Sequence, residues 1–130
     1  MKKIIIFTLL GLVLIAVGVY AISYLTNPLK RSEERIRYDI LALTPIGSSI
    51  EDVIGTIENN ESWEWSGHIN RYHGFPADAN NNVRVGEQSI RVTIGRYQGI
   101  NRFPYVTHVV VFWGFDESSK LIDIRVWKST

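Results

Sequence analysis

The most prominent feature of the hydrophobic pattern is an apolar run at the N-terminus. It extends from Ile4 to Leu25, follows Met1, Lys2 and Lys3, and contains no charged side chain. As a helix rising about 1.5 Å per residue, such a run just crosses the roughly 30 Å hydrocarbon layer of a lipid bilayer. The pattern therefore predicts a membrane anchor over residues 1–25 and a folded domain over residues 26–130.

A cleaved signal peptide is the alternative interpretation of this segment. Signal peptides share the basic start and the apolar run, and Val19-Tyr20-Ala21 is similar to their small-residue cleavage site. The run is nevertheless longer than the apolar part of a typical signal peptide, and it continues past that site to Leu25. We therefore favour an uncleaved anchor.

The charges beside the apolar run are nearly balanced, so the positive-inside rule alone does not decide its orientation. Lys2 and Lys3 precede the run, and the basic residues that follow it are Lys30, Arg31, Arg35 and Arg37. The short basic N-terminus has the shape of a signal sequence, which favours a cytoplasmic N-terminus. The pattern thus predicts a single-pass protein of the inner (cytoplasmic) membrane whose domain faces the periplasm or the cell exterior.

Two short amphipathic helices are predicted after Pro28, which interrupts the first helix. Within residues 31–43, the apolar residues at helical spacing are Ile36, Ile40 and Leu43. In the next segment, TPIGSSIEDVIGTIE, a Pro-Gly turn and two serines suited to a helix N-cap precede an apolar stripe of Ile50, Val53, Ile54 and Ile57. Because so short a helix is marginal alone, its stripe is expected to pack on a sheet.

The second half of the chain alternates between apolar and polar residues, as antiparallel strands do. The alternation is clearest over 89–97 and over two segments, 105–115 and 120–128, that flank the turn residues Asp116–Ser119. Residues 62–65 alternate more briefly, and 76–88 are rich in Asn, Asp and Gly, as surface loops are. The predicted fold class is α+β, with two short helices packed on a three- to four-stranded antiparallel sheet.

The register of the predicted hairpin assigns residues to the two faces of the sheet. Closing the hairpin over Asp116–Ser119 pairs Phe115 with Lys120, and hence Trp113 with Ile122, Val111 with Ile124 and Val109 with Val126. This apolar face matches that of Ile90, Val92 and Ile94. We therefore expect it to form the core beneath the two helices.

The opposite face mixes apolar, aromatic and charged residues, and it is the predicted protein-binding face. Its candidate binding residues are Arg91, His108, Val110, Phe112, Arg125 and Trp127, beside Thr93 and Asp123. Exposed aromatic residues and arginines are the usual anchors of protein interfaces. Replacing Phe112 or Trp127 by Ala is then expected to weaken binding and to leave the fold largely intact. The alternative is that residues 62–75 cover this face and complete a second small core.

Composition narrows the classes of partner and chemistry. The chain has 14 Lys and Arg residues, or 12 without Lys2 and Lys3, against 13 Asp and Glu. A domain so close to neutral is a poor candidate for binding nucleic acid. The absence of cysteine excludes disulfides and thiolate metal sites.

No motif in the sequence predicts a metal site, a cofactor or catalysis. The spacing of His68 and His73 places them on neither one helix face nor one strand face. Residues 78–89 begin like a calcium loop but lack its glycine and its final glutamate, so an Asx-rich turn is expected. Glu64 near His68 resembles an acid–base pair, but pairs of this kind arise by chance in any domain. We therefore predict a protein that is not an enzyme, with a small membrane-anchored hydrolase as the alternative.

The order of predicted elements resembles the small outer-membrane assembly lipoproteins of the BamE (SmpA/OmlA) type, whose helix-helix-sheet fold is shared with β-lactamase inhibitory proteins. The matching pieces are TPIGSSIEDVIGTIE and VVVFWGFDESSKLIDIRVW. The chain differs in having no lipobox cysteine. The resemblance implies a non-catalytic envelope protein that works by protein contact. The expected function is an anchored extracytoplasmic protein-binding module, and the alternative is an immunity or inhibitor protein that neutralises a secreted effector or enzyme.

Overall fold

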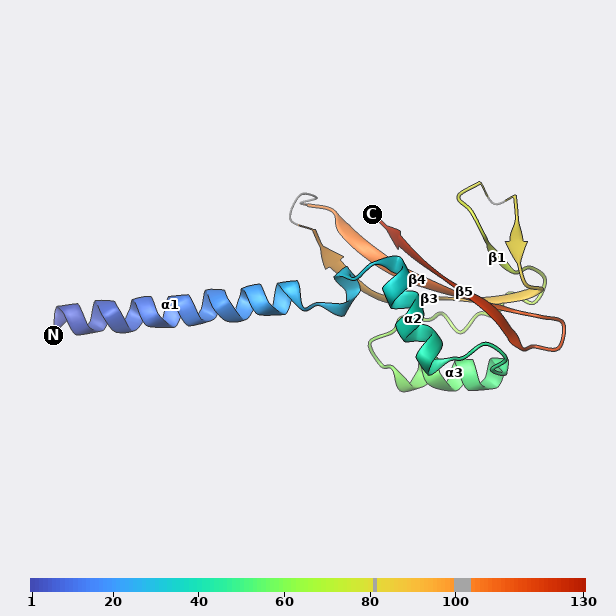
Figure 1. Cartoon of the computed structure of the whole chain (residues 1–130), viewed down its shortest axis with the longest axis horizontal. Helices are drawn as coiled ribbons and strands as arrows, with labels where there is room; N and C mark the ends of the chain where they lie inside the picture. The colour runs from blue at the N-terminus through green and yellow to red at the C-terminus, as the bar shows by residue number, and fades with distance from the viewer. Residues whose placement is uncertain (81, 100–103) are drawn as a thin grey trace. The chain divides into compact units, whose positions relative to one another are not determined.

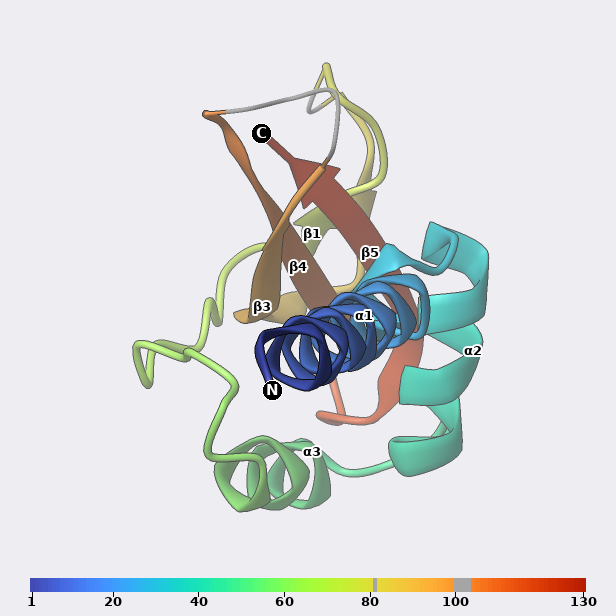
Figure 2. The ribbon, with the colours of Figure 1, turned by 90° about the vertical axis from the view of Figure 1, so that its left-hand side faces the viewer.

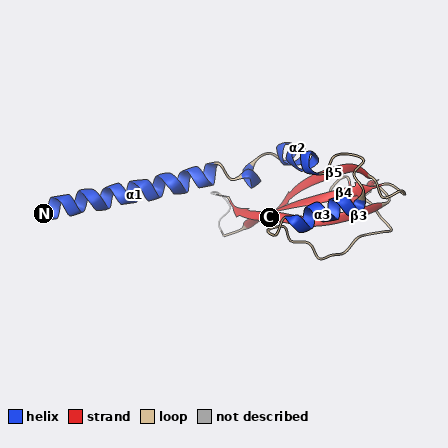
Figure 3. Ribbon diagram, turned by 90° about the horizontal axis from the view of Figure 1, so that it is seen from below, coloured by secondary structure: helices blue, strands red, loops and turns tan. Residues whose placement is uncertain are grey.

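The computed structural model describes residues 1–80, 82–99 and 104–130, and for residues 23 and 24 it describes the backbone alone. The chain divides into two compact units, Met1–Lys30 and Arg31–Thr130. The first contains helix α1 (Lys2–Leu25) and the short 3₁₀ helix η1 (Pro28–Lys30). All other helices and strands belong to the second unit, which has an α+β fold (Figures 1 and 3).

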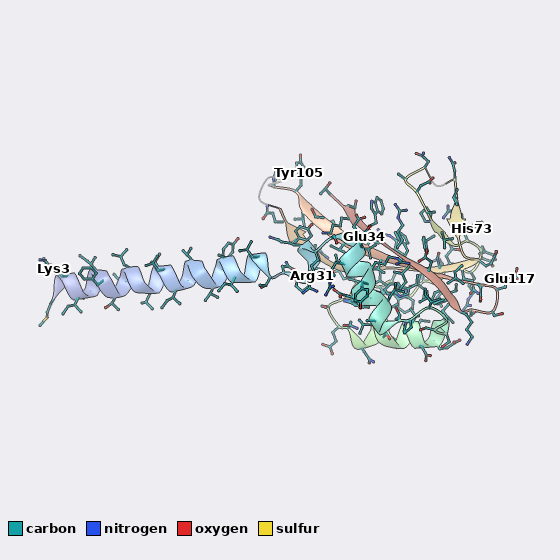
Figure 4. All side chains as sticks on the ribbon, viewed as in Figure 1. Lys3, Arg31, Glu34, His73, Tyr105 and Glu117 are labelled. Atoms are coloured by element: carbon teal, nitrogen blue, oxygen red, sulfur yellow. The ribbon has the colours of Figure 1, made fainter. Side chains whose placement is uncertain are left out.

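Helix α1 is long and apolar enough to cross a membrane. The apolar span runs over Lys2–Ile22, and none of it is buried. Side chains project from it on all sides (Figure 4). A helix that is apolar all round requires an apolar environment, and a bilayer provides one.

The two short helices begin at the residues that the sequence indicates. Helix α2 (Glu33–Leu43) is capped by Ser32, and α3 (Ile50–Asn59) by Ser49, whose hydroxyl accepts a hydrogen bond from the Asp52 N–H at 3.2 Å. Their buried residues are Ile36 and Ile40 in α2 and Ile50, Val53 and Ile57 in α3. Helix α2 lies alongside strand β5 (Leu121–Ser129) (Figure 2). Leu43, expected in the core, is instead 54% exposed because it lies at the end of α2.

A three-stranded antiparallel sheet in the order β3-β4-β5 supports both helices. Strands β3 (Gln88–Gln98) and β4 (Val106–Phe115) precede β5. The sheet's inner face contributes the main core, and its buried apolar residues include Ile90, Val92, Val111, Trp113, Ile124 and Val126. The predicted strand at 62–65 is reduced to an isolated bridge between Glu64 and Thr93.

The predicted register of the β4–β5 hairpin was wrong by two residues. Trp113 lies opposite Ile124 rather than Ile122, because Phe115 pairs with Leu121 and a bulge follows at Ile122. From Asp123 onward the shift is two residues, so each side chain keeps its predicted face, since the side-chain period of a strand is two. Nearer the turn the bulge exchanges two residues: Leu121 is buried opposite Phe115, and Ile122 leaves the core with 41% of its surface exposed.

A buried hydrogen bond joins the end of α2 to the centre of the sheet. The indole N–H of Trp113 donates to the Thr44 hydroxyl oxygen at 3.0 Å, and that hydroxyl donates to the Ile40 carbonyl at 3.0 Å. Trp113 and Thr44 are both buried. Because the indole N–H has no access to water, the Thr44 hydroxyl removes the cost of burying it.

A second layer covers the opposite face of the sheet, which we call the outer face. Strands β1 (Phe75–Pro76) and β2 (Arg84–Val85) pair as a small antiparallel hairpin, and we call residues 74–86 the flap. In Figure 1 α3 lies below the strands and β1 above them. Phe75 packs with Val110 and Phe112 in a small second core, with Val85 beside it. The sequence predicted a surface loop over 76–88, of which position 81 lies outside the described residues.

The flap approaches the sheet closely because glycine lacks a side chain. A Cβ atom on Gly114 of β4 would lie 2.8 Å from the Phe75 ring and 2.9 Å from the Val85 carbonyl oxygen. A Cβ atom on Gly74 would lie 1.9 Å from the same oxygen. Side chains at these two positions are therefore incompatible with the observed packing.

Replacing Thr44 by Val should lower the melting temperature of the folded unit. The change keeps the shape but leaves the buried Trp113 N–H without an acceptor, which costs about 1–3 kcal/mol. For a domain of this size, each kcal/mol shifts the midpoint by about 4–8 °C. Tryptophan fluorescence of the full chain in mild detergent measures the shift. The control Thr56→Val removes an exposed hydroxyl bond to the Asp52 carbonyl, and equal midpoints for the two variants would contradict the assignment.

Replacing Gly114 by Ala should also destabilise the folded unit, because the added methyl overlaps the flap. Overpacking of this kind costs about 1–3 kcal/mol. Gly55 in α3 is the matched control, since its Cβ would meet no atom within 4 Å. Ala at this helical position should stabilise the unit by about 0.5–1 kcal/mol. A Gly114→Ala melting midpoint at or above that of the parent would show that the flap does not depend on close approach at Gly114.

Candidate protein-binding face

The sheet brings the predicted binding residues together on its outer face. Arg91, Phe112 and Arg125 form one cross-strand row over β3, β4 and β5. Thr93, Val110 and Trp127 form the next row. His108 follows on β4, opposite Arg96 on β3 and Ser129 on β5. The alternation of side chains along the strands therefore predicted this grouping correctly.

The expectation that all of these residues are accessible was wrong for two of them. Phe112 is 7% exposed and Val110 is 1% exposed, because the flap covers both. The rings of Phe112 and Phe75 lie with their centroids 6.0 Å apart. The alternative of a second small core over the outer face therefore applies, although Phe75 and Val85 complete it rather than most of residues 62–75.

The remaining predicted residues border the covered area. Arg91 and Trp127 are exposed, with 42% of the Trp127 surface accessible, whereas His108 and Arg125 are half-buried. The Arg125 guanidinium donates to the Pro76 carbonyl oxygen at 2.5 Å and lies 6.0 Å from the centroid of the Trp127 ring. Arg125 therefore helps to hold the flap in place. Its guanidinium already contacts Pro76 and Trp127 of the same chain.

An open cleft lies on the outer face along β3. It consists of two neighbouring hollows of about 530 and 280 Å³ that share Ser66 and Arg91. The larger is also lined by Trp63, Glu64, Trp65 and Thr93. The smaller extends toward the flap, and its lining includes His68, Asn70, Phe75, Arg84 and Phe112. We call the two hollows together the β3 cleft.

Residues 62–70 form the outer wall of this cleft, and sequence reasoning did not assign them that role. Glu64 exchanges two backbone hydrogen bonds with Thr93, of 2.8 and 3.0 Å, and Asn70 exchanges two of 2.9 Å with Ser89. The Trp63 ring packs against Trp113, with centroids 6.1 Å apart. The alternation of Ser62–Trp65 indicated a strand, but it did not indicate which strand this segment would meet.

The chain itself occupies part of each outer edge of the three-stranded sheet. Residues 62–70 bond to Ser89 and Thr93 on the β3 edge through the four bonds just described. Along β5, Leu121 bonds to Gly47 and Ser48 of the loop between α2 and α3. Farther along, the Ile124 carbonyl accepts from Arg37 at 2.9 Å, and the Lys128 N–H donates to Glu33 at 3.2 Å. Pairing of a partner strand at either edge would have to displace these bonds.

The titratable residues considered for chemistry do not form a metal cluster. Within the described part of the chain, no group of three or more His, Asp or Glu side chains is placed to hold a metal ion. Glu64 forms an ion pair with Arg96. Asp78, which begins the calcium-like segment, instead accepts a hydrogen bond from the Asn80 N–H at 3.1 Å, as an Asx turn does.

Replacing Phe112 by Ala should destabilise the folded unit far more than replacing Trp127 by Ala. Phe112 fills the second core, and truncating a buried Phe typically costs about 3–5 kcal/mol. Trp127 is partly exposed at the end of β5, where a substitution typically changes stability by about 0.5 kcal/mol. Urea titrations of both variants in the same detergent measure the difference. A Trp127→Ala variant as unstable as Phe112→Ala would place Trp127 in the second core.

Comparison with known protein families, curated proteins and solved structures found no match for this chain. The resemblance to the BamE-type lipoproteins therefore stays a prediction. The function has to be argued from the anchor helix and from the geometry of the folded unit.

Proposed function

We propose that this protein is a membrane-anchored module that binds another protein. Its apolar helix α1 would hold the chain in the inner membrane of a bacterial envelope, with the folded unit on the extracytoplasmic side. The basic start of the chain and the long uncharged run that follows support this arrangement. Nucleic acid is not the proposed partner, because the chain is close to neutral.

The observation that carries this proposal is the open β3 cleft on the outer face. Its lining combines Trp63, Trp65 and Arg91, residue types that are enriched at the energetic centres of protein interfaces. Trp127 adds exposed aromatic surface two strands away on the same face. A wide, shallow depression with aromatic and arginine side chains suits a protein segment better than a small substrate, which is usually largely enclosed.

The state of the sheet edges indicates how a partner would bind. Strand addition requires an edge with free backbone N–H and C=O groups. Here part of each outer edge already bonds to residues of the same chain, at Ser89 and Thr93 of β3 and at Leu121, Ile124 and Lys128 of β5. Contact through side chains in the β3 cleft therefore explains binding better than extension of the sheet does.

Site-specific photo-cross-linking should detect the partner from the cleft and not from the helices. A photoreactive residue at the exposed Ser66 lines both hollows, whereas one at Glu51 lies on the exposed surface of α3. We expect a discrete protein adduct from position 66 in intact cells and none from position 51. Adducts of equal yield from both positions, or none from either, would argue against a binding module that uses this face.

Orientation can be measured independently by protease treatment of spheroplasts. The folded unit should be digested by added protease before lysis, because we place it outside the cytoplasm. A cytoplasmic protein monitored in the same samples controls for leakage. Digestion only after lysis would overturn the extracytoplasmic assignment, and the geometry of the β3 cleft would be unaffected.

A further inference from the structure

Among the arginines of the folded unit that the structure describes, which exclude Arg102, Arg91 differs from the others in having no polar partner. Those paired with carboxylates are Arg31, Arg35, Arg37 and Arg96, whereas Arg71, Arg84 and Arg125 donate to Gln88 or to backbone carbonyl oxygens. Among the residues that the structure describes, none forms a hydrogen bond or ion pair with the Arg91 guanidinium. Its charge is therefore available to a ligand in the β3 cleft.

Phe112 supports the Arg91 guanidinium from below. The guanidinium carbon lies 6.0 Å from the centroid of the Phe112 ring, and that ring is itself fixed against Phe75 in the second core. Stacking on an aromatic ring uses the flat face of a guanidinium and leaves its in-plane N–H donors unused. The donors therefore remain free to bind an acceptor with two oxygen atoms, as a carboxylate has.

The charges that line the β3 cleft do not balance. Arg91 and Arg84 contribute positive charge, and the acidic lining residue, Glu64, is already paired with Arg96. Arg84 makes a 3.3 Å hydrogen bond to the Gly74 carbonyl oxygen, which does not neutralise its charge. An uncompensated positive cleft favours a negatively charged ligand through electrostatic complementarity.

We infer that the β3 cleft binds an extended acidic segment of the partner protein, with an Asp or Glu carboxylate held by Arg91. This inference rests on the proposed function and specifies the chemistry of the partner. The aromatic lining from Trp63 and Trp65 provides contact area beside the carboxylate. A small free anion would use none of that area, so the lining favours a peptide chain.

A pair of synthetic peptides tests the inference directly. The probes are a fluorescein-labelled peptide of alternating Glu and Thr, and the same peptide with Gln in place of every Glu. Fluorescence anisotropy with the full chain in uncharged detergent at low salt measures binding. We expect the Glu peptide to bind at least about tenfold more tightly than the Gln peptide, a difference of about 1.4 kcal/mol, and added salt to reduce the difference.

Arg91→Gln should weaken binding of the Glu peptide by about tenfold. The matched control is Arg35→Gln, which removes the same charge from the exposed surface of α2 and should leave binding unchanged. Tryptophan fluorescence melts verify that both variants are folded, as expected for exposed side chains. In cells, the adduct from position 66 should be lost in Arg91→Gln and retained in Arg35→Gln.

Several results would overturn the inference. Equal affinity for the two peptides, or an Arg91→Gln variant that binds like the parent, would remove the carboxylate assignment. Displacement of the peptide by millimolar inorganic phosphate at constant ionic strength would indicate a small-anion pocket instead. A cross-linked partner that is insensitive to Arg91→Gln would retain the proposed function and overturn the acidic-segment assignment. Arg91-dependent peptide binding without any cellular adduct would overturn the proposed function alone.

Discussion

The fold of this domain depends on the burial of Trp113 at the centre of its three-stranded sheet. The indole fills the space beneath the helices, and its N–H is satisfied by Thr44 at the end of α2. Helix α2 ends at its C-cap residue, Thr44, because the Pro45 that follows disfavours helical backbone in the preceding residue, and the chain turns toward α3. The backbone bonds of Gly47 and Ser48 to Leu121 then join the same turn to the β4–β5 hairpin. One buried polar contact thus joins the end of α2 to the centre of the sheet.

On the outer face of the sheet, the close packing of the flap depends on the small size of glycine. With no side chain at Gly114 the flap lies directly on β4, and with none at Gly74 the flap's own two segments approach closely. Phe75 then closes over Phe112 and Val110. The covered part of the outer face is thereby removed from any interface. The part that remains accessible lies along β3, where residues of the segment 62–70 line the β3 cleft. Phe112 of the second core also lies beneath the Arg91 guanidinium. The covered residues of the outer face therefore help to position Arg91 in the open β3 cleft.

Local patterns predicted those features that depend on neighbouring residues. The apolar run, the Ser49 cap and the alternation of β3, β4 and β5 were sufficient for the helices, the strands and their faces. The register was not predictable, because a bulge at Ile122 has no signature in the alternation. The flap was missed because a strand pair of two residues is too short to show a period. The unpaired state of Arg91 depends on long-range contacts such as Arg96 with Glu64, which no local pattern contains.

The bonds along the sheet edges affect how neighbouring copies of the protein can pair. Molecules held in a bilayer share a thin layer, where their effective local concentration far exceeds that of the same molecules in free solution. Exposed strand edges would then promote pairing between neighbouring copies and the growth of continuous sheets. In this domain, the two edges of the sheet are partly bonded within the chain. Residues 62–70 bond to β3, and the side chains of Glu33 and Arg37 bond to β5. These bonds leave fewer free backbone groups for pairing between neighbouring copies.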